Sequence, residues 1–120
     1  MNLKILPYEL TVCKVNSASC IDISAEFYFI AKTDEEISLV CKTEDAPEDT
    51  AAREDLVFFS RYRWYCFSLV GILSKLSGIL AEKEIGIFAV STYNTDYILV
   101  KAENLAAAAD ALKDEGYFII

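Results

Sequence analysis

The second half of the chain alternates between helical and strand-like hydrophobic spacing, and this order limits the fold more than any other feature. Apolar residues recur at helical spacing from Gly71 to Lys83, and an alanine-rich helical face follows Asn104. Four strand-like runs surround these two segments: 56–60, 87–91, 96–101 and 117–120. The order is therefore strand, helix, strand, strand, helix, strand.

This order is the split βαβ plan, in which two helices cover one face of an antiparallel sheet. We therefore expect an α+β fold of the ferredoxin-like βαββαβ type. The expected elements are antiparallel hairpins at 26–42 and 87–101 and helices near 71–84 and 104–115. Gly86 and Gly116 follow the two helical segments and are expected to cap their C-terminal ends.

The first half carries weaker signals of the same kind. Residues 3–15 are rich in strand formers, whereas 16–24 read as a loop or at most a short helix. A short helix is expected within 43–55, because Pro47 suits the first turn of a helix and acidic residues follow it.

The two hairpins also resemble each other in sequence. The segment Phe29–Thr33, an acidic turn and Ile37–Val40 echo Phe88–Thr92, a polar turn and Tyr97–Val100. In this comparison Glu36 falls where Asp96 falls. The spacing is about half of the chain and predicts two similar halves, 1–60 and 61–120, of which the first is degenerate.

The composition excludes several classes of function. The chain has 120 residues and a net charge of −8, which disfavours binding to nucleic acid, although arginines and aromatics alternate over 61–65. No apolar run is long enough to span a bilayer, and the N-terminus lacks the pattern of a signal peptide. We expect a cytoplasmic protein that binds neither nucleic acid nor a membrane.

The residues that usually carry metal binding and catalysis are sparse. The chain has no histidine, and its four cysteines form no C-x-x-C pair: Cys13, Cys20, Cys41 and Cys66. We expect reduced thiols that behave as small apolar side chains, with no metal and no cofactor. No nucleophile or phosphate-binding motif is present, so we expect no enzyme activity.

Two segments, Phe67–Leu73 and Ile85–Lys101, are similar to the ACT-domain family. Within that family the chain resembles small bacterial tandem-ACT proteins, whose second half is similar to the CASTOR-type arginine sensors. The stretch from Ser91 to Val100 (Ser-Thr-Tyr-Asn-Thr-Asp-Tyr-Ile-Leu-Val) carries the resemblance most specifically. The resemblance implies two ACT-like halves, a regulatory protein that binds a small ligand, an amino acid by preference, and assembly into a homo-oligomer.

The resemblance also implies a site. Gly71 and Ile72 would place backbone amides at the positive end of a helix, next to a ligand carboxylate. Ser91, Thr92 and Asp96 would line the same pocket, and Asp96 would meet a ligand cation.

Each of these residues also has a simpler interpretation. Gly71 also fits a turn glycine that begins the helix, and Asp96 also fits a carboxylate that caps turn amides. A structural interaction module without a metabolite is the alternative function. It is favoured by the lack of a Gly-Pro turn before Phe67 and by the weak first half.

Overall fold

The structure is a computed structural model that divides into two compact units. It describes residues 2–48, 50–62 and 71–120. The helical unit comprises Met1–Pro7 and Val57–Ile120, and the strand unit comprises Tyr8–Leu56. The first seven residues therefore group with the second half of the chain, whereas the assignment of two ACT-like halves to 1–60 and 61–120 remains a prediction.

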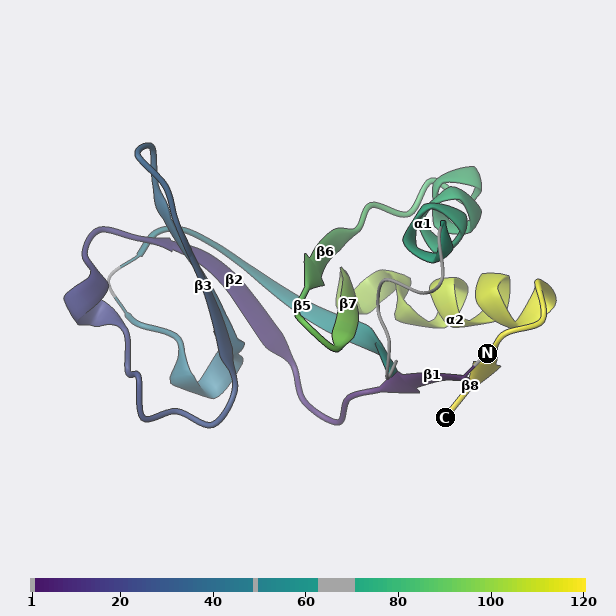
Figure 1. Cartoon of the computed structure of the whole chain (residues 1–120), viewed down its shortest axis with the longest axis horizontal. Coiled ribbons are helices and arrows are strands. Elements are labelled where there is room, and N and C mark those ends of the chain that lie inside the picture. The colour runs from purple at the N-terminus through teal and green to yellow at the C-terminus, as the bar shows by residue number, and fades with distance from the viewer. Residues whose placement is uncertain (1, 49, 63–70) are drawn as a thin grey trace. The chain divides into compact units, whose positions relative to one another are not determined.

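The helical unit contains the predicted βαββαβ order (Figure 1). Its elements are β5 (Thr50–Tyr62, from Val57 onward), α1 (Ile72–Glu82), β6 (Phe88–Ser91), β7 (Thr95–Val100), α2 (Leu105–Asp114) and β8 (Phe118–Ile119). A short 3₁₀ turn, Ala102–Asn104, precedes α2. The predicted α+β fold with antiparallel pairing is confirmed, and so are both C-terminal helices and the hairpin over 87–101.

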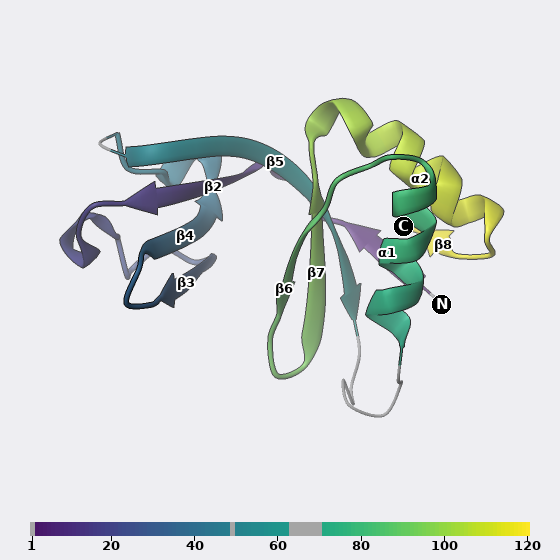
Figure 2. The same ribbon diagram turned by 90° about the horizontal axis from the view of Figure 1, so that it is seen from above.

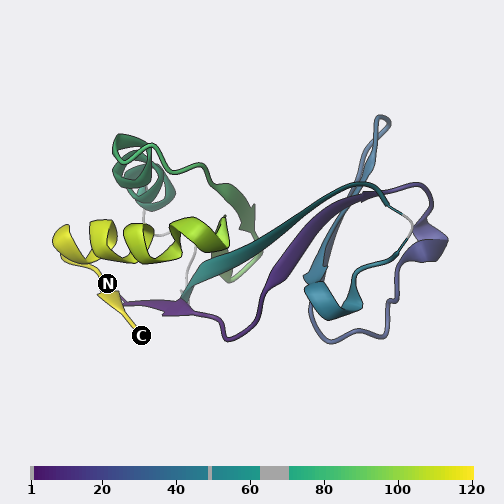
Figure 3. The same ribbon diagram turned by 180° about the vertical axis from the view of Figure 1, so that it is seen from behind.

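One further strand enters this sheet from the N-terminus. β1 (Asn2–Ile5) pairs antiparallel with β5 and parallel with β8, so β1 and β8 lie side by side (Figure 3). The sheet of the helical unit therefore runs β6-β7-β5-β1-β8. The N-terminal strand takes the place next to β5 that β8 would hold in a four-stranded sheet of this plan.

Both helices pack on the same face of this sheet. Their shared core consists of buried residues from β1, α1, β7, α2 and the segments beside them: Leu3, Leu76, Leu80, Ile85, Ile98, Val100, Ala108, Ala109, Leu112 and Tyr117. The alanines of α2 let this helix approach closely, because a methyl group occupies little space between the helix and its neighbours. None of the described helices is long and apolar enough to cross a membrane.

The two helices end in the same kind of cap. In α1, the Ile85 amide donates to the Leu80 carbonyl at 3.0 Å and the Glu84 amide to the Ala81 carbonyl at 2.9 Å. In α2, the amides of Tyr117 and Gly116 make the corresponding bonds to Leu112 and Lys113. These are Schellman motifs, which place one residue in the left-handed region.

Glycine occupies that left-handed position only in α2. Gly116 has φ of 93°, as expected, but in α1 the position belongs to Glu84, with φ of 59°. The prediction that Gly86 caps α1 is therefore wrong. The helix ends two residues earlier, and a glutamate adopts the unfavourable backbone conformation.

The strand unit is a four-stranded antiparallel sheet. Its order is β3 (Tyr28–Lys32), β4 (Ile37–Lys42), β2 (Leu10–Val15) and the first part of β5, Thr50–Leu56. The predicted hairpin over 26–42 is confirmed, and a 3₁₀ turn at Ala18–Cys20 lies within the predicted loop. The expected helix near Pro47 is wrong. A 3₁₀ turn, Thr43–Asp45, ends before it, and β5 begins at Thr50 because its backbone pairs with β2.

No α-helix covers the strand unit within the residues described between 8 and 56. Its small core consists of Cys13, Val15, Leu39 and Cys41. Ile21 and Ala46 pack against this core from irregular segments. The first half of the chain is thus degenerate in a physical sense, because loops cover the sheet where the second half uses helices.

Candidate ligand site

Three of the five residues predicted to bind a ligand lie at the end of the β6–β7 hairpin. Ser91 and Asp96 stand directly opposite each other as the last pair of this ladder, and Thr92 begins the turn. On its other side β7 pairs with β5, where Asp96 stands opposite Arg61. The Asp96 side chain is half-buried, whereas Ser91 and Thr92 are exposed.

The side chain of Thr92 holds the turn. Its hydroxyl donates to the Thr95 carbonyl at 3.0 Å and accepts from the Thr95 amide at 3.2 Å. Thr33 stabilises the β3–β4 turn in a similar way, because its hydroxyl accepts hydrogen bonds from the amides of Glu35 and Glu36 at 3.2 Å. Thr92 therefore has a structural role that needs no ligand.

This correspondence changes the predicted alignment of the two hairpins. Thr33 pairs through its backbone with Glu36, as Thr92 pairs with Thr95. Lys32 stands opposite Ile37 at the place where Ser91 stands opposite Asp96. The prediction that Glu36 matches Asp96 is wrong by one residue. Ile37 occupies that place, so the carboxylate of Asp96 has no counterpart in the first hairpin.

Gly71 stands at the N-terminal boundary of α1 in a left-handed conformation, with φ of 80° and ψ of 5°. No described atom outside its chain neighbours lies within 4 Å of where a Cβ would be. The backbone conformation, and not a close approach by another segment, is what favours glycine here. Gly71 is exposed, so the start of the helix also has open space beside it.

The first amides of α1 have no hydrogen-bond partner within the helix. The Lys75 amide makes the first turn by donating to the Gly71 carbonyl at 2.9 Å. The amides of Ile72 and the next two residues have no acceptor within the helix, since an α-helix leaves its first N–H groups unpaired. Gly71 has no side chain to cap them, and the first turn contains no acidic residue. The helix dipole adds a partial positive charge at this end.

The structure places these two groups of residues on separate elements of the helical unit. The turn of the β6–β7 hairpin, the beginning of α1 and the C-terminal end of β5 lie at the same end of the helical unit (Figure 2). Residues 63–70, which link β5 to α1 in the chain, lie outside the described residues, as do most of the Arg61–Tyr65 run and Cys66. The hairpin brings Ser91, Thr92 and Asp96 together, and their use with Gly71 and Ile72 as one site remains a prediction.

The strand unit contains a hollow that the sequence did not indicate. It has a volume of about 320 Å³ and is lined by Tyr8, Glu9, Lys42, Thr43 and Glu44. These residues come from segments more than thirty positions apart, which the pairing of Leu10 with Lys42 joins. No local sequence motif marks such a site, because it depends on the register between β2 and β4.

The two buried thiols of the strand unit, Cys13 and Cys41, are not suited to act as nucleophiles. Burial, together with smaller contributions from the nearby Cys13 and Asp45, raises the pKa of Cys41 to about 11. Burial also raises the pKa of Cys13. Both are free thiols, as is the half-buried Cys20, and no group of three potential metal-binding side chains occurs among the described residues. Their reduced state in the isolated protein remains a prediction.

Comparison with known proteins supports the class of fold. Residues 63–114 match the family description of the ACT domain, a segment that holds α1, β6, β7 and α2. A solved structure from Agobacterium tumefaciens is similar over 99% of this chain and 91% of its own, with 28% identity and a TM-score of 0.86. No protein of curated description matches the sequence.

Two aspartate kinase structures share the fold at low identity. The regulatory subunit of aspartate kinase from Thermus flavus is similar over 95% of this chain and 96% of its own length, with 9% identity and a TM-score of 0.63. Aspartate kinase from Clostridium acetobutylicum covers 93% of this chain over 33% of its own length, with 11% identity and a TM-score of 0.65. The chain thus contains a segment of ACT-domain type and shares its overall fold with these aspartate kinase structures.

Proposed function

We propose that this chain is a regulatory module that binds a small amino acid-like ligand and has no catalytic activity of its own. The observation that carries the proposal is the match of 63–114 to the ACT domain, because this segment contains all five predicted site residues. The fold shared with the regulatory subunit of an aspartate kinase points the same way.

The proposed site uses opposite charges at its two ends. A ligand carboxylate would accept hydrogen bonds from the first amides of α1, starting at Ile72, where the helix dipole favours an anion. The carboxylate of Asp96 would bind the ligand's cationic group, and the exposed hydroxyl of Ser91 would add a polar contact. Thr92 would contribute by fixing the turn that carries both residues.

Two substitutions test this arrangement. The amino acid that most stabilises the wild-type chain would be titrated by calorimetry into the wild type, Gly71→Ala and Asp96→Ala. Gly71→Ala should weaken binding by more than tenfold, about 1.4 kcal/mol, because a side chain would stand beside the donor amides. Asp96→Ala should change selectivity among ligands, most for those with a cationic side chain, and should retain carboxylate binding.

Gly116→Ala is the matched control for Gly71→Ala. Both glycines have positive φ, and at neither would an added Cβ meet a described atom within 4 Å, so alanine imposes similar backbone strain at each. Gly116 ends α2 and is not part of the proposed site. Equal affinity for all variants would place binding elsewhere, and equal losses in both glycine variants would attribute the effect to stability.

A homo-oligomeric interaction module without a metabolite is the second candidate. Phe118 and Ile120 favour it, because they expose 66% and 69% of their surfaces at the end of the chain. Under this alternative no amino acid would bind at Gly71 and Asp96 in the helical unit. Phe118→Ser would then lower the oligomeric state measured by light scattering, whereas Ile23→Ser, at a 76% exposed apolar position in the strand unit, would not.

A further inference from the structure

We infer that the hollow in the strand unit, lined by Tyr8, Glu9, Lys42, Thr43 and Glu44, is a second binding site, and that it takes a small zwitterion carrying a carboxylate and an ammonium group. The site lies wholly within Tyr8–Leu56 and uses none of the residues at α1 or the β6–β7 hairpin. It therefore stands independently of the function proposed above. Its volume of about 320 Å³ lies at the small end of the usual range for ligand pockets, roughly 300–1,000 Å³.

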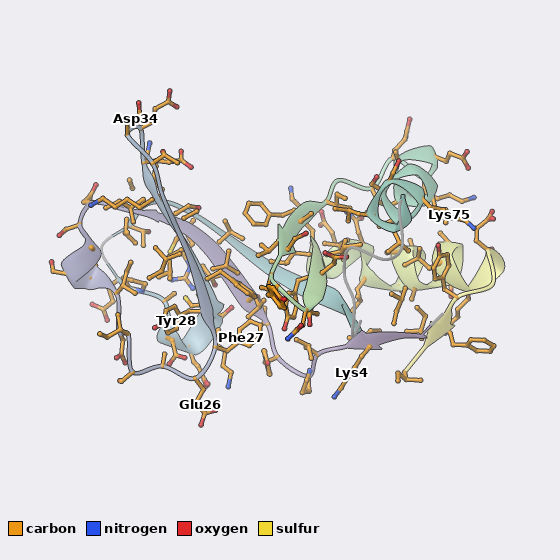
Figure 4. All side chains as sticks on the ribbon, in the orientation of Figure 1. Lys4, Glu26, Phe27, Tyr28, Asp34 and Lys75 are labelled. Carbon is orange, nitrogen blue, oxygen red and sulfur yellow. The ribbon has the colours of Figure 1, made fainter. Side chains whose placement is uncertain are left out.

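Lys42 supplies a cation that the protein covers but does not fully pair. Only 21% of its side chain is exposed, and its ammonium lies 4.7 Å from the centre of the Tyr8 ring. Among the described residues its one ion pair is with Glu26, at 3.9 Å, and the Glu26 side chain is 91% exposed. Figure 4 shows Glu26 projecting away from the ribbon. Such a long, solvent-exposed pair contributes little, so the three ammonium donors retain capacity for a ligand anion.

Thr43 adds a hydrogen-bond donor beside Lys42. The buried Thr11 hydroxyl donates to the Thr43 oxygen at 2.9 Å, and this bond commits the Thr43 hydroxyl to accept. Its own hydrogen then needs another acceptor, and the described part of the chain provides none. A ligand carboxylate between Lys42 and Thr43 would accept from both groups.

The charges of Glu9 and Glu44 favour a ligand that carries an ammonium group in addition to its carboxylate. Both line the same hollow and are exposed, so the charged groups around it sum to one positive and two negative. A plain carboxylate would meet repulsion from the two glutamates, and a plain amine would give Lys42 no anion beyond Glu26. A molecule with both groups satisfies both sides, and the ring of Tyr8 provides an apolar surface for its side chain.

The test uses L-leucine and two analogues that each lack one charged group. Isocaproate has the same chain without the ammonium, and isoamylamine has it without the carboxylate. Each would be titrated to millimolar concentration into the ¹⁵N-labelled full chain while the backbone amide signals of 8, 9 and 42–44 are followed. L-leucine should shift these signals to saturation, and both analogues should bind at least tenfold more weakly.

Variants connect the shifts to the charges. Lys42→Met keeps the apolar stem and should weaken L-leucine binding at least tenfold, Lys42→Arg should restore most of it, and Lys14→Met, at an exposed lysine of β2, should have no effect. Glu44→Gln removes the charge of an exposed side chain while keeping its size, and it should weaken the binding of L-leucine but not of isocaproate. Gly71→Ala should leave these shifts unchanged.

Two results would overturn the inference. L-leucine that leaves the signals of 8, 9 and 42–44 in place would show that the hollow is not a site for such a ligand. Equal binding of L-leucine and isocaproate would show that the hollow does not recognise the ammonium. Either result leaves the proposal for the helical unit standing, because that proposal is tested by substitutions at Gly71 and Asp96, which do not line the hollow.

Discussion

Glu84 closes α1 with φ of 59°, and replacing it by glycine should stabilise the protein. A left-handed conformation costs a residue with a side chain roughly 1–2 kcal/mol, and glycine does not incur this cost. Glycine gains freedom in the unfolded chain, which offsets about 0.4–1 kcal/mol of the benefit. Removing a negative charge from the C-terminal end of a helix adds about 0.3 kcal/mol. Glu84→Gly should therefore raise the free energy of unfolding by about 1 kcal/mol.

Gly116 provides the opposite substitution in the other helix. It holds the same Schellman position at φ of 93°, and a Cβ added there would meet no described atom within 4 Å. Gly116→Ala should thus cost about 1 kcal/mol through backbone strain alone. Glu84→Ala is the charge control, because it removes the carboxylate but keeps the strained conformation, and it should change stability by about 0.3 kcal/mol or less.

Denaturant unfolding followed by circular dichroism measures all three variants against the wild type. For a chain of this size 1 kcal/mol corresponds to a shift of about 4 °C in the melting temperature, so thermal scans provide an independent check. If Glu84→Gly were no more stable than Glu84→Ala, left-handed strain at the end of α1 would be refuted as the cause.

Three further predictions concern the thiols and the core. Alkylation followed by mass spectrometry should find all four cysteines reduced in freshly purified protein. Cys20 should be labelled before Cys13 and Cys41, because burial raises the pKa of the latter two thiols. A pair of cysteines that resists alkylation until a reductant is added would contradict this prediction. The pKa of Cys41 is raised from an ordinary 9.0 to about 11, so its contribution to stability is fully present below pH 9 and is lost as the pH rises toward 11. The free energy of unfolding should therefore decline more steeply over that range in the wild type than in Cys41→Val. Parallel declines in the two proteins would contradict this prediction. Leu80→Ala should lower the free energy of unfolding by about 2–5 kcal/mol, because Leu80 is fully buried in the core shared by the helices and the sheet. Ile23→Ala, at a 76% exposed position, should change it by about 0.5 kcal/mol or less. Similar losses in the two variants would contradict the described core.

The periodic parts of the fold were accessible from the sequence because their signals are local. The spacing of Leu76 and Leu80 and the alanines of α2 each mark a helical face, and both hairpins alternate around a polar turn. Where the secondary structure differs from the prediction, pairing with a strand distant in sequence determines the conformation. β5 begins at Thr50, near the helix expected around Pro47, because its backbone pairs with β2 from Thr50 to Leu56, with one register shift between Lys14 and Val15.

Other features have no local signal at all. The insertion of β1 between β5 and β8 joins the two ends of the chain, and nothing within Asn2–Ile5 specifies it. Glu84 occupies a position where glycine is usual, so the nearby Gly86 was the natural but wrong choice for the cap. The hollow around Lys42 depends on strand register, and the predicted site depends on how Gly71 is presented beside the hairpin.

A thermal-shift screen of the wild-type chain against the twenty amino acids tests the central claim most directly. A ligand that binds only the folded protein stabilises it by about 2.7 kcal/mol at a concentration of one hundred times its dissociation constant. We expect one amino acid, or a small related group, to raise the melting temperature in a concentration-dependent manner. If none of the twenty stabilised the protein at millimolar concentration, the proposed amino acid-binding function would be contradicted and the interaction module would be favoured.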